Sequence, residues 1–127
     1  MKKLKRKCVV LVVDDDHEIR EVMDVVLGTA GFDVKLASEG GEALALLRSG
    51  LRPNVIVLDL MMPGMNGWQF RSEQIKDPQI AAIPVVVLSG DGNVADKATR
   101  LSATGILRKP VELATLVDTI SQACAPS

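Results

Sequence analysis

Short apolar runs alternate five times with segments of helical period along the 127-residue chain. The apolar runs are rich in β-branched residues and lie at residues 8–13, 32–37, 55–58, 84–88 and, more weakly, 106–107. Three of these runs are apolar at every position, as expected of strands that are covered on both faces. Apolar residues spaced by three and four positions predict helices at 19–27, 43–47 and 113–120, and less regular ones at 68–75 and 94–101. Five successive β-α units predict an α/β fold with a doubly wound parallel sheet and helices on both of its faces.

The composition fits one folded domain. With 127 residues, of which 47% are hydrophobic, the chain can bury an ordinary core without a disulfide or a structural metal. Cys8 and Cys124 have the spacing of neither a disulfide framework nor a metal site, and we expect both to be structural. The first apolar run is too short for a signal peptide or a membrane span, so we expect a cytoplasmic protein without membrane insertion.

The charge is distributed unevenly. Five of the 15 basic residues lie in residues 1–7, and the rest of the chain is acidic overall. We therefore divide the chain into a basic N-terminal tail, residues 1–7, and a folded domain, residues 8–124. A short basic tail is usually a solvated terminus, and an acidic domain is a poor surface for nucleic acid. We expect no direct binding to nucleic acid.

Polar side chains follow four of the five predicted strands. The first strand is followed by three carboxylates, the third by one, the fourth by a hydroxyl and the fifth by an ammonium group: Asp14, Asp15, Asp16, Asp59, Ser89 and Lys109. The carboxyl ends of parallel strands share one edge of the sheet, where doubly wound folds bind their ligands. Carboxylates gathered at one edge repel one another unless a cation neutralises them, and Mg²⁺ suits such oxygen ligands.

A carboxylate such as Asp59 can attack phosphorus and form an acyl phosphate. The transfer needs positive charge at the phosphoryl oxygens, which Mg²⁺ and Lys109 can provide, and the Ser89 hydroxyl can donate a hydrogen bond. Each residue alone has a simpler explanation. The acids at 14–16 suit the start of a helix, Ser89 suits a loop or a helix cap, and Lys109 suits a solvated position before a proline. Their gathering at one sheet edge favours the phosphoryl site.

Four segments, LVVDDDHEIREVM, VIVLDLMMPGMNGW, VVVLSG and GILRKP, occur in this order. As a set they resemble the receiver domain of two-component response regulators, over nearly the whole chain. The resemblance implies a (βα)5 flavodoxin-like sheet with strand order 2-1-3-4-5. It also implies that Asp59 is the phosphoacceptor, that Asp15 binds Mg²⁺ directly and Asp14 through water, and that the backbone carbonyl of Met61 is a further metal ligand.

The same resemblance also implies roles for further residues of the site. Ser89 is the switch hydroxyl and Lys109 the lysine that binds the phosphoryl group, whereas Met61 and Asp91 stand where family members tune phosphoryl lifetime. Ile106 stands on the signalling surface where many members carry an aromatic residue, so an aromatic rotamer switch is absent. The charged pattern that pairs some receivers is also missing near the fifth strand and helix, and we expect a monomer or weak dimer.

The resemblance implies a signalling role. A sensor histidine kinase or a phosphotransfer protein would phosphorylate Asp59, and the surface formed by the fourth helix, fifth strand and fifth helix would then change and bind an unknown downstream protein. Only self-phosphorylation and slow autodephosphorylation are expected, rather than enzymatic turnover. Two alternatives remain: a Mg²⁺-dependent phosphohydrolase of haloacid-dehalogenase type, which would need an Asp at the position of Met61, and a constitutive docking module with an idle site.

Overall fold

The computed structural model describes residues 7–90 and 94–124. Five strands form one sheet: β1 (Val9–Val13), β2 (Asp33–Ala37), β3 (Val55–Asp59), β4 (Val85–Ser89) and β5 (Gly105–Arg108). All neighbouring pairs are parallel, and the strand order is β2-β1-β3-β4-β5. The predicted doubly wound sheet with order 2-1-3-4-5 is therefore confirmed.

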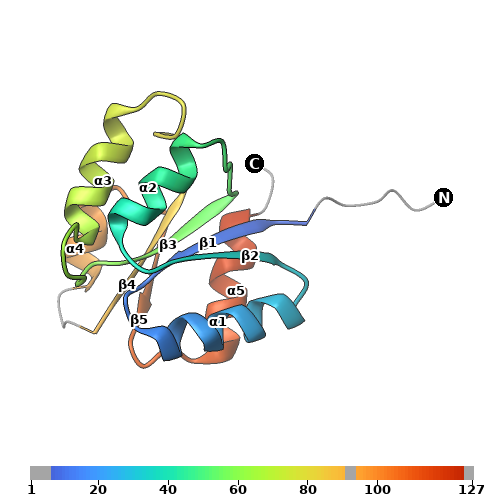
Figure 1. Ribbon diagram of the computed structural model, residues 1–127. Coiled ribbons are helices and arrows are strands. Elements are labelled where there is room, and N and C mark those ends of the chain that lie inside the picture. Colours follow the sequence, from blue (N-terminus) through green and yellow to red (C-terminus); the bar gives the residue numbers. More distant parts are fainter. Residues whose placement is uncertain (1–6, 91–93, 125–127) are drawn as a thin grey trace.

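One helix follows each strand: α1 (His17–Thr29), α2 (Gly40–Arg48), α3 (Gly67–Lys76), α4 (Val94–Arg100) and α5 (Leu113–Cys124). Figure 1 shows α1 and α5 on one face of the sheet, and α2 and α3 on the other. Among the described residues, no helix is both long and apolar enough to cross a bilayer.

The central strands β3 and β4 are buried at every residue. Because side chains alternate between the two faces of a sheet, Ile56 and Leu58 pack with α2 and α3, whereas Val55 and Val57 pack with α1 and α5. Two separate apolar cores result, one on each face. This arrangement explains why the strand sequences show no polar alternation.

The register brings the strand ends together. Val13 lies opposite Leu58, Asp59 opposite Leu88, and Ser89 opposite Arg108. The residues that end or follow β1, β3, β4 and β5 therefore meet at one edge of the sheet, as the sequence pattern predicts.

Cys8, just before β1, and Cys124, at the end of α5, form a disulfide with 6.1 Å between their Cα atoms. The spacing of the two cysteines predicted no disulfide framework, and this pairing corrects that prediction, whereas a structural role for both cysteines agrees with it. Their separation of 116 residues carries no sequence pattern for pairing. Only the packing of α5 against the sheet, through Leu116 and Ile120, brings the two ends of the domain into contact.

Candidate functional site

Two carboxylates and one ammonium group form the centre of the site. Asp14 follows β1 and is fully buried, and Asp59 ends β3 with 2% of its surface exposed. The Lys109 Nζ atom lies 3.4 Å from Asp14 Oδ2 and 3.5 Å from Asp59 Oδ2. The single ammonium group thus bridges two buried carboxylates that come from different strands.

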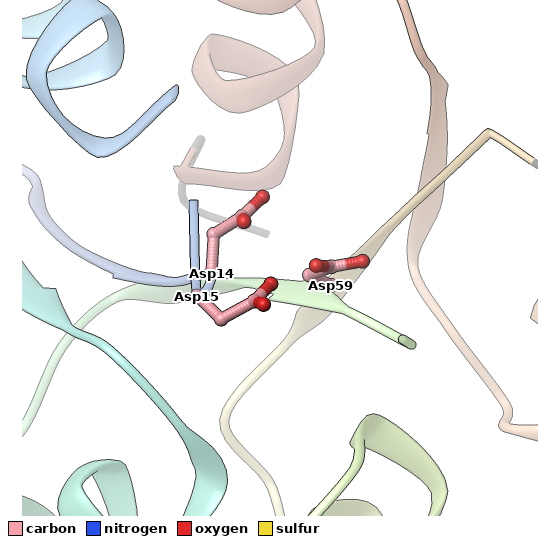
Figure 2. A group of neighbouring side chains, drawn as sticks. All are labelled: Asp14, Asp15 and Asp59. Carbon is pink, nitrogen blue, oxygen red and sulfur yellow. The ribbon is translucent and has the colours of Figure 1, made fainter. Parts of the chain in front are cut away.

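Asp15 adds a third carboxylate, from the solvent side. One carboxylate oxygen from each of Asp14, Asp15 and Asp59 lies within 4.8 Å of those of the other two. Figure 2 shows Asp14 and Asp15 leaving the end of β1 beside Asp59 at the end of β3. Three carboxylates facing one lysine leave negative charge to be neutralised.

The donor set fits a hard divalent cation. Asp14 Oδ2 is buried and accepts no hydrogen bond from the described part of the chain, although buried oxygens almost always have a partner. Carboxylate oxygens that are partly open to solvent suit Mg²⁺, which keeps several of its waters. A buried oxygen that has the charge of Lys109 nearby but accepts no hydrogen bond, beside two further carboxylates, is therefore consistent with the predicted magnesium site.

The environment of Asp59 favours its protonated form. Burial, and then the charge of Asp14, raise the pKa of Asp59 to about 6. The Met61 backbone N–H, which donates to Asp59 Oδ1 over 3.2 Å, and the Lys109 ammonium group act in the opposite direction. The carboxylate is ionised and nucleophilic above this pKa, and a bound cation would favour the ionised form further.

The other predicted site residues lie around this centre. Ser89 ends β4 and is buried, whereas Met61 follows β3 with an exposed side chain. Ile106 lies half-buried in β5, two strands away from Asp59 in the sheet. Asp91 lies outside the described residues, so its predicted place beside the site is not tested.

Two contacts support the loop after β1, and the sequence indicated only the first, through the acids at the start of a helix. The Asp16 carboxylate caps α1 by accepting hydrogen bonds from the backbone N–H groups of Glu18, at 2.9 Å, and Ile19, at 3.4 Å. Arg20 Nη1 donates to the Asp14 carbonyl over 2.7 Å. An Asp directly before a helix is a recognisable cap, but the Arg20 contact depends on how the loop folds back.

The start of α3 packs directly against the backbone next to Asp59. A Cβ atom at Gly67 would lie 2.8 Å from both the Asp59 carbonyl oxygen and Leu60 Cα. The Gly67 backbone N–H also donates to the Leu60 carbonyl over 3.1 Å. Glycine is therefore required at this position by a close approach of two backbones.

We expect Gly67→Ala to lower the free energy of unfolding by about 2–3 kcal/mol, because the added methyl group meets backbone atoms that cannot rotate away. It should also slow any chemistry at Asp59. Gly28→Ala in α1 is the matched control, since its new Cβ would meet no atom within 4 Å. Urea unfolding of both variants tests this, and equal effects at the two sites would contradict it.

Comparisons with known proteins identify the family and the fold. The family model described as "Response regulator receiver domain" matches residues 10–121. Protein PilH of Pseudomonas aeruginosa is 35% identical over 91% of this chain and 97% of its own. The solved structure of the chemotaxis protein CheY4 of Vibrio cholerae has a TM-score of 0.84 at 32% identity, over 93% of this chain and 99% of that chain. A putative response regulator from Chloroflexus aurantiacus has a TM-score of 0.87 at 28% identity, over 95% and 100% of the two chains.

Several relatives are longer than this chain. The probable transcriptional regulator ycf27 of Guillardia theta is 39% identical over 77% of this chain but only 37% of its own length. The chain thus spans well under half of that relative, and the match lies within the domain that β1 to α5 form.

Proposed function

The chain belongs to the family of response regulator receiver domains, and on that premise we propose that Asp59 accepts a phosphoryl group from a phosphohistidine. The donor is a sensor histidine kinase or a phosphotransfer protein, and the process is two-component signalling. The observation that carries the proposal is the bridging of the buried Asp14 and Asp59 by Lys109 at the carboxyl edge of the sheet.

The transfer is a displacement at phosphorus. A carboxylate oxygen of Asp59 forms the new P–O bond while the P–N bond to the donor imidazole breaks, and the imidazole nitrogen keeps the electron pair and takes up a proton. The ammonium group of Lys109 neutralises phosphoryl oxygens, and the Ser89 hydroxyl donates a hydrogen bond to one of them. Asp59 must be ionised to attack.

Asp14, Asp15 and Asp59, with the backbone carbonyl of Met61, would hold Mg²⁺. The bound ion supplies positive charge to the phosphoryl oxygens. Asp14 Oδ2 supports this assignment, because it accepts no hydrogen bond and a bound cation would use its buried lone pair.

The phosphorylated form acts by changing the α4-β5-α5 surface. The phosphoryl group carries about −1.5 to −2 charges if it resembles a phosphate monoester, in place of the single charge of the Asp59 carboxylate, and it lies next to the ends of β4 and β5. Ser89 and Lys109 respond to that charge, and the change reaches Ile106 and the neighbouring helices, where a downstream protein binds. Met61 and Asp91 set the phosphoryl lifetime. We place this protein in the cytoplasm, as a monomer or weak dimer without enzymatic turnover and without direct contact to nucleic acid.

An apolar groove supports a protein donor. A cavity of about 290 Å³ lies between α1 and α5, lined by Ile19, Val22 and Leu113 and reaching Lys109 at one end. Val22 and Leu113 are each about half exposed. A donor helix lying on these side chains would place its phosphohistidine at the edge that holds Asp59.

The test is the mass of the intact protein after incubation with acetyl phosphate, with and without Mg²⁺. We expect one phosphoryl adduct that requires Mg²⁺ and that borohydride reduction, followed by peptide mapping, locates at Asp59. An adduct at another residue would refute the assignment. Steady release of phosphate from a generic ester would favour the phosphohydrolase. Binding of neither phosphoryl group nor beryllofluoride would favour the docking module with an idle site.

A further inference from the structure

We propose that α3 forms a mechanical connection between Asp59 and the C-terminal end of α4, in which the Arg71 side chain is the positioning residue. The inference rests on the proposed function, because it names a second route, besides Ser89, by which the phosphoryl site reaches the signalling surface.

Arg71 holds the end of α4 directly. Its Nε atom donates to the Leu101 carbonyl over 2.9 Å, and its Nη2 atom donates to the Ser102 carbonyl over 3.4 Å. Both carbonyls lie in the turn that ends α4, where helical carbonyls lack their usual partners. A side chain of α3 thus provides the cap for α4.

That turn is itself well defined. Ser102 has a φ of +54°, a left-handed conformation, and its backbone N–H donates to the Thr99 carbonyl over 3.1 Å. The Ala103 backbone N–H donates to the Ala98 carbonyl over 2.9 Å. This pair of hydrogen bonds is the usual left-handed ending of a helix, and it turns the carbonyls of residues 101 and 102 toward α3.

Gln74 fixes the Arg71 side chain in place. It is fully buried, and its Oε1 atom accepts a hydrogen bond from Arg71 Nη1 over 2.9 Å. Its Nε2 atom donates to the carbonyls of Ile80, at 2.9 Å, and Ile83, at 3.1 Å. The guanidinium group is therefore held by a side chain of α3 that is itself fixed to the segment before β4.

The charge of Arg71 makes the contact hard to break. Arg71 is 8% exposed, and burial lowers the pKa of its guanidinium group. Among the described residues, no carboxylate lies within ion-pair distance of it. The carbonyls at the negative end of α4 are what compensate this buried charge. Moving the end of α4 away would remove two of the three hydrogen-bond acceptors of this charge and leave it only the neutral Gln74 Oε1, so α3 and the end of α4 should move together.

The other end of α3 is attached to the phosphoacceptor strand. Gly67 lies against the Asp59 carbonyl and Leu60, without space for a methyl group. Arg71 comes four residues later and lies on the same buried face of α3. A displacement of the backbone at Asp59 therefore shifts α3 as a unit and reaches α4 through Arg71.

The experiment is a beryllofluoride titration with Mg²⁺ present, followed by Trp68 fluorescence, on the wild type and on Arg71→Met. Beryllofluoride mimics a phosphoryl group on a carboxylate. Without Arg71, binding no longer has to displace α4, and we expect the dissociation constant to fall by about five-fold. Amide exchange in residues 97–103, which we expect beryllofluoride to change in the wild type, should stop responding in the variant.

Arg52→Met is the matched control. Arg52 Nη1 also donates to carbonyls at a helix end, those of Leu47 at 2.7 Å and Leu51 at 2.9 Å, but that helix is α2. We expect its beryllofluoride affinity and its exchange response to equal those of the wild type. Arg71→Lys keeps the charge with a single donor atom, and should give an intermediate result if Arg71→Met is too unstable to measure.

Unchanged affinity together with an unchanged response of residues 97–103 in both Arg71 variants would overturn this inference and leave the proposed function intact. A wild type that does not bind beryllofluoride would overturn the proposed function, and the inference with it. A tighter variant whose residues 97–103 have stopped responding supports the connection.

Discussion

Replacing Asp59 by asparagine is expected to abolish phosphoryl incorporation and, at the same time, to stabilise the metal-free protein near neutral pH. The loss of incorporation follows from chemistry, because an amide has no anionic oxygen to attack phosphorus. The gain in stability follows from the environment of the carboxylate, which is buried beside Asp14. The same substitution therefore removes the chemical function of this residue and increases the free energy of unfolding.

The sign of the stability effect follows from linkage. The pKa of Asp59 is raised from 3.8 to about 6 in the folded chain, first by burial and then by Asp14. The folded chain therefore binds this proton more tightly than the unfolded chain. The resulting stability is complete below about pH 3.8 and is lost as the pH rises through about 6. Near neutral pH the charged carboxylate costs about 1–3 kcal/mol, which asparagine removes.

Urea unfolding without metal, at about pH 5 and near neutral pH, measures this effect. The advantage of Asp59→Asn should be larger at the higher pH, and Mg²⁺ should reduce it by stabilising the wild type. Asp16→Asn is the matched control, because asparagine caps a helix about as well as aspartate and Asp16 is exposed. A variant that is less stable than the wild type at both pH values would mean that the contact with Lys109 outweighs burial and repulsion.

The sheet and the centre of the site were predictable because they depend on local patterns. Apolar runs identify the strands, and a residue that directly follows a strand in a parallel sheet can lie only at its carboxyl edge. The meeting of Asp14, Asp59 and Lys109 is therefore a consequence of chain order. Their roles in phosphoryl transfer stay predictions, which the titrations and mass measurements above address.

The irregular helical pattern at 68–75 has a physical cause in the structure. The buried face of α3 consists of Gly67, Phe70, Arg71 and Gln74, which have helical spacing. Two of the four are polar, and their side chains donate hydrogen bonds to carbonyls outside α3. A pattern that counts apolar residues cannot detect such a face. The Arg71 contact with Leu101 joins residues 30 positions apart and the Gln74 contact with Ile80 joins residues 6 apart, and both depend on packing.

Reducing the disulfide between Cys8 and Cys124 is expected to lower the free energy of unfolding by about 3–5 kcal/mol, because the released loop is long. The two residues are 116 positions apart, so the bond restricts almost the whole unfolded chain. In the folded chain the same ends are already held by β1 and by the packing of α5. Most of the effect therefore acts on the unfolded state.

Reducing the disulfide should leave phosphorylation of the protein unchanged, although it lowers the stability. Cys8 precedes β1 whereas Asp14 follows it, so the disulfide and the site lie at opposite ends of this strand. We expect the reduced protein to incorporate phosphoryl groups at the rate of the oxidised protein, at temperatures where both are folded. Thermal unfolding with and without reductant, beside the mass measurement, tests the two expectations together.

Cys124→Ser provides the control for the disulfide. This variant should unfold like the reduced wild type, and added reductant should leave its midpoint unchanged. Two free thiols in the non-reduced wild type, with no shift on adding reductant, would contradict the prediction. A reducing compartment keeps thiols unpaired, so in a cytoplasm the reduced, less stable form would be the one that functions. Oxidation would then stabilise the domain without changing the phosphorylation of its site.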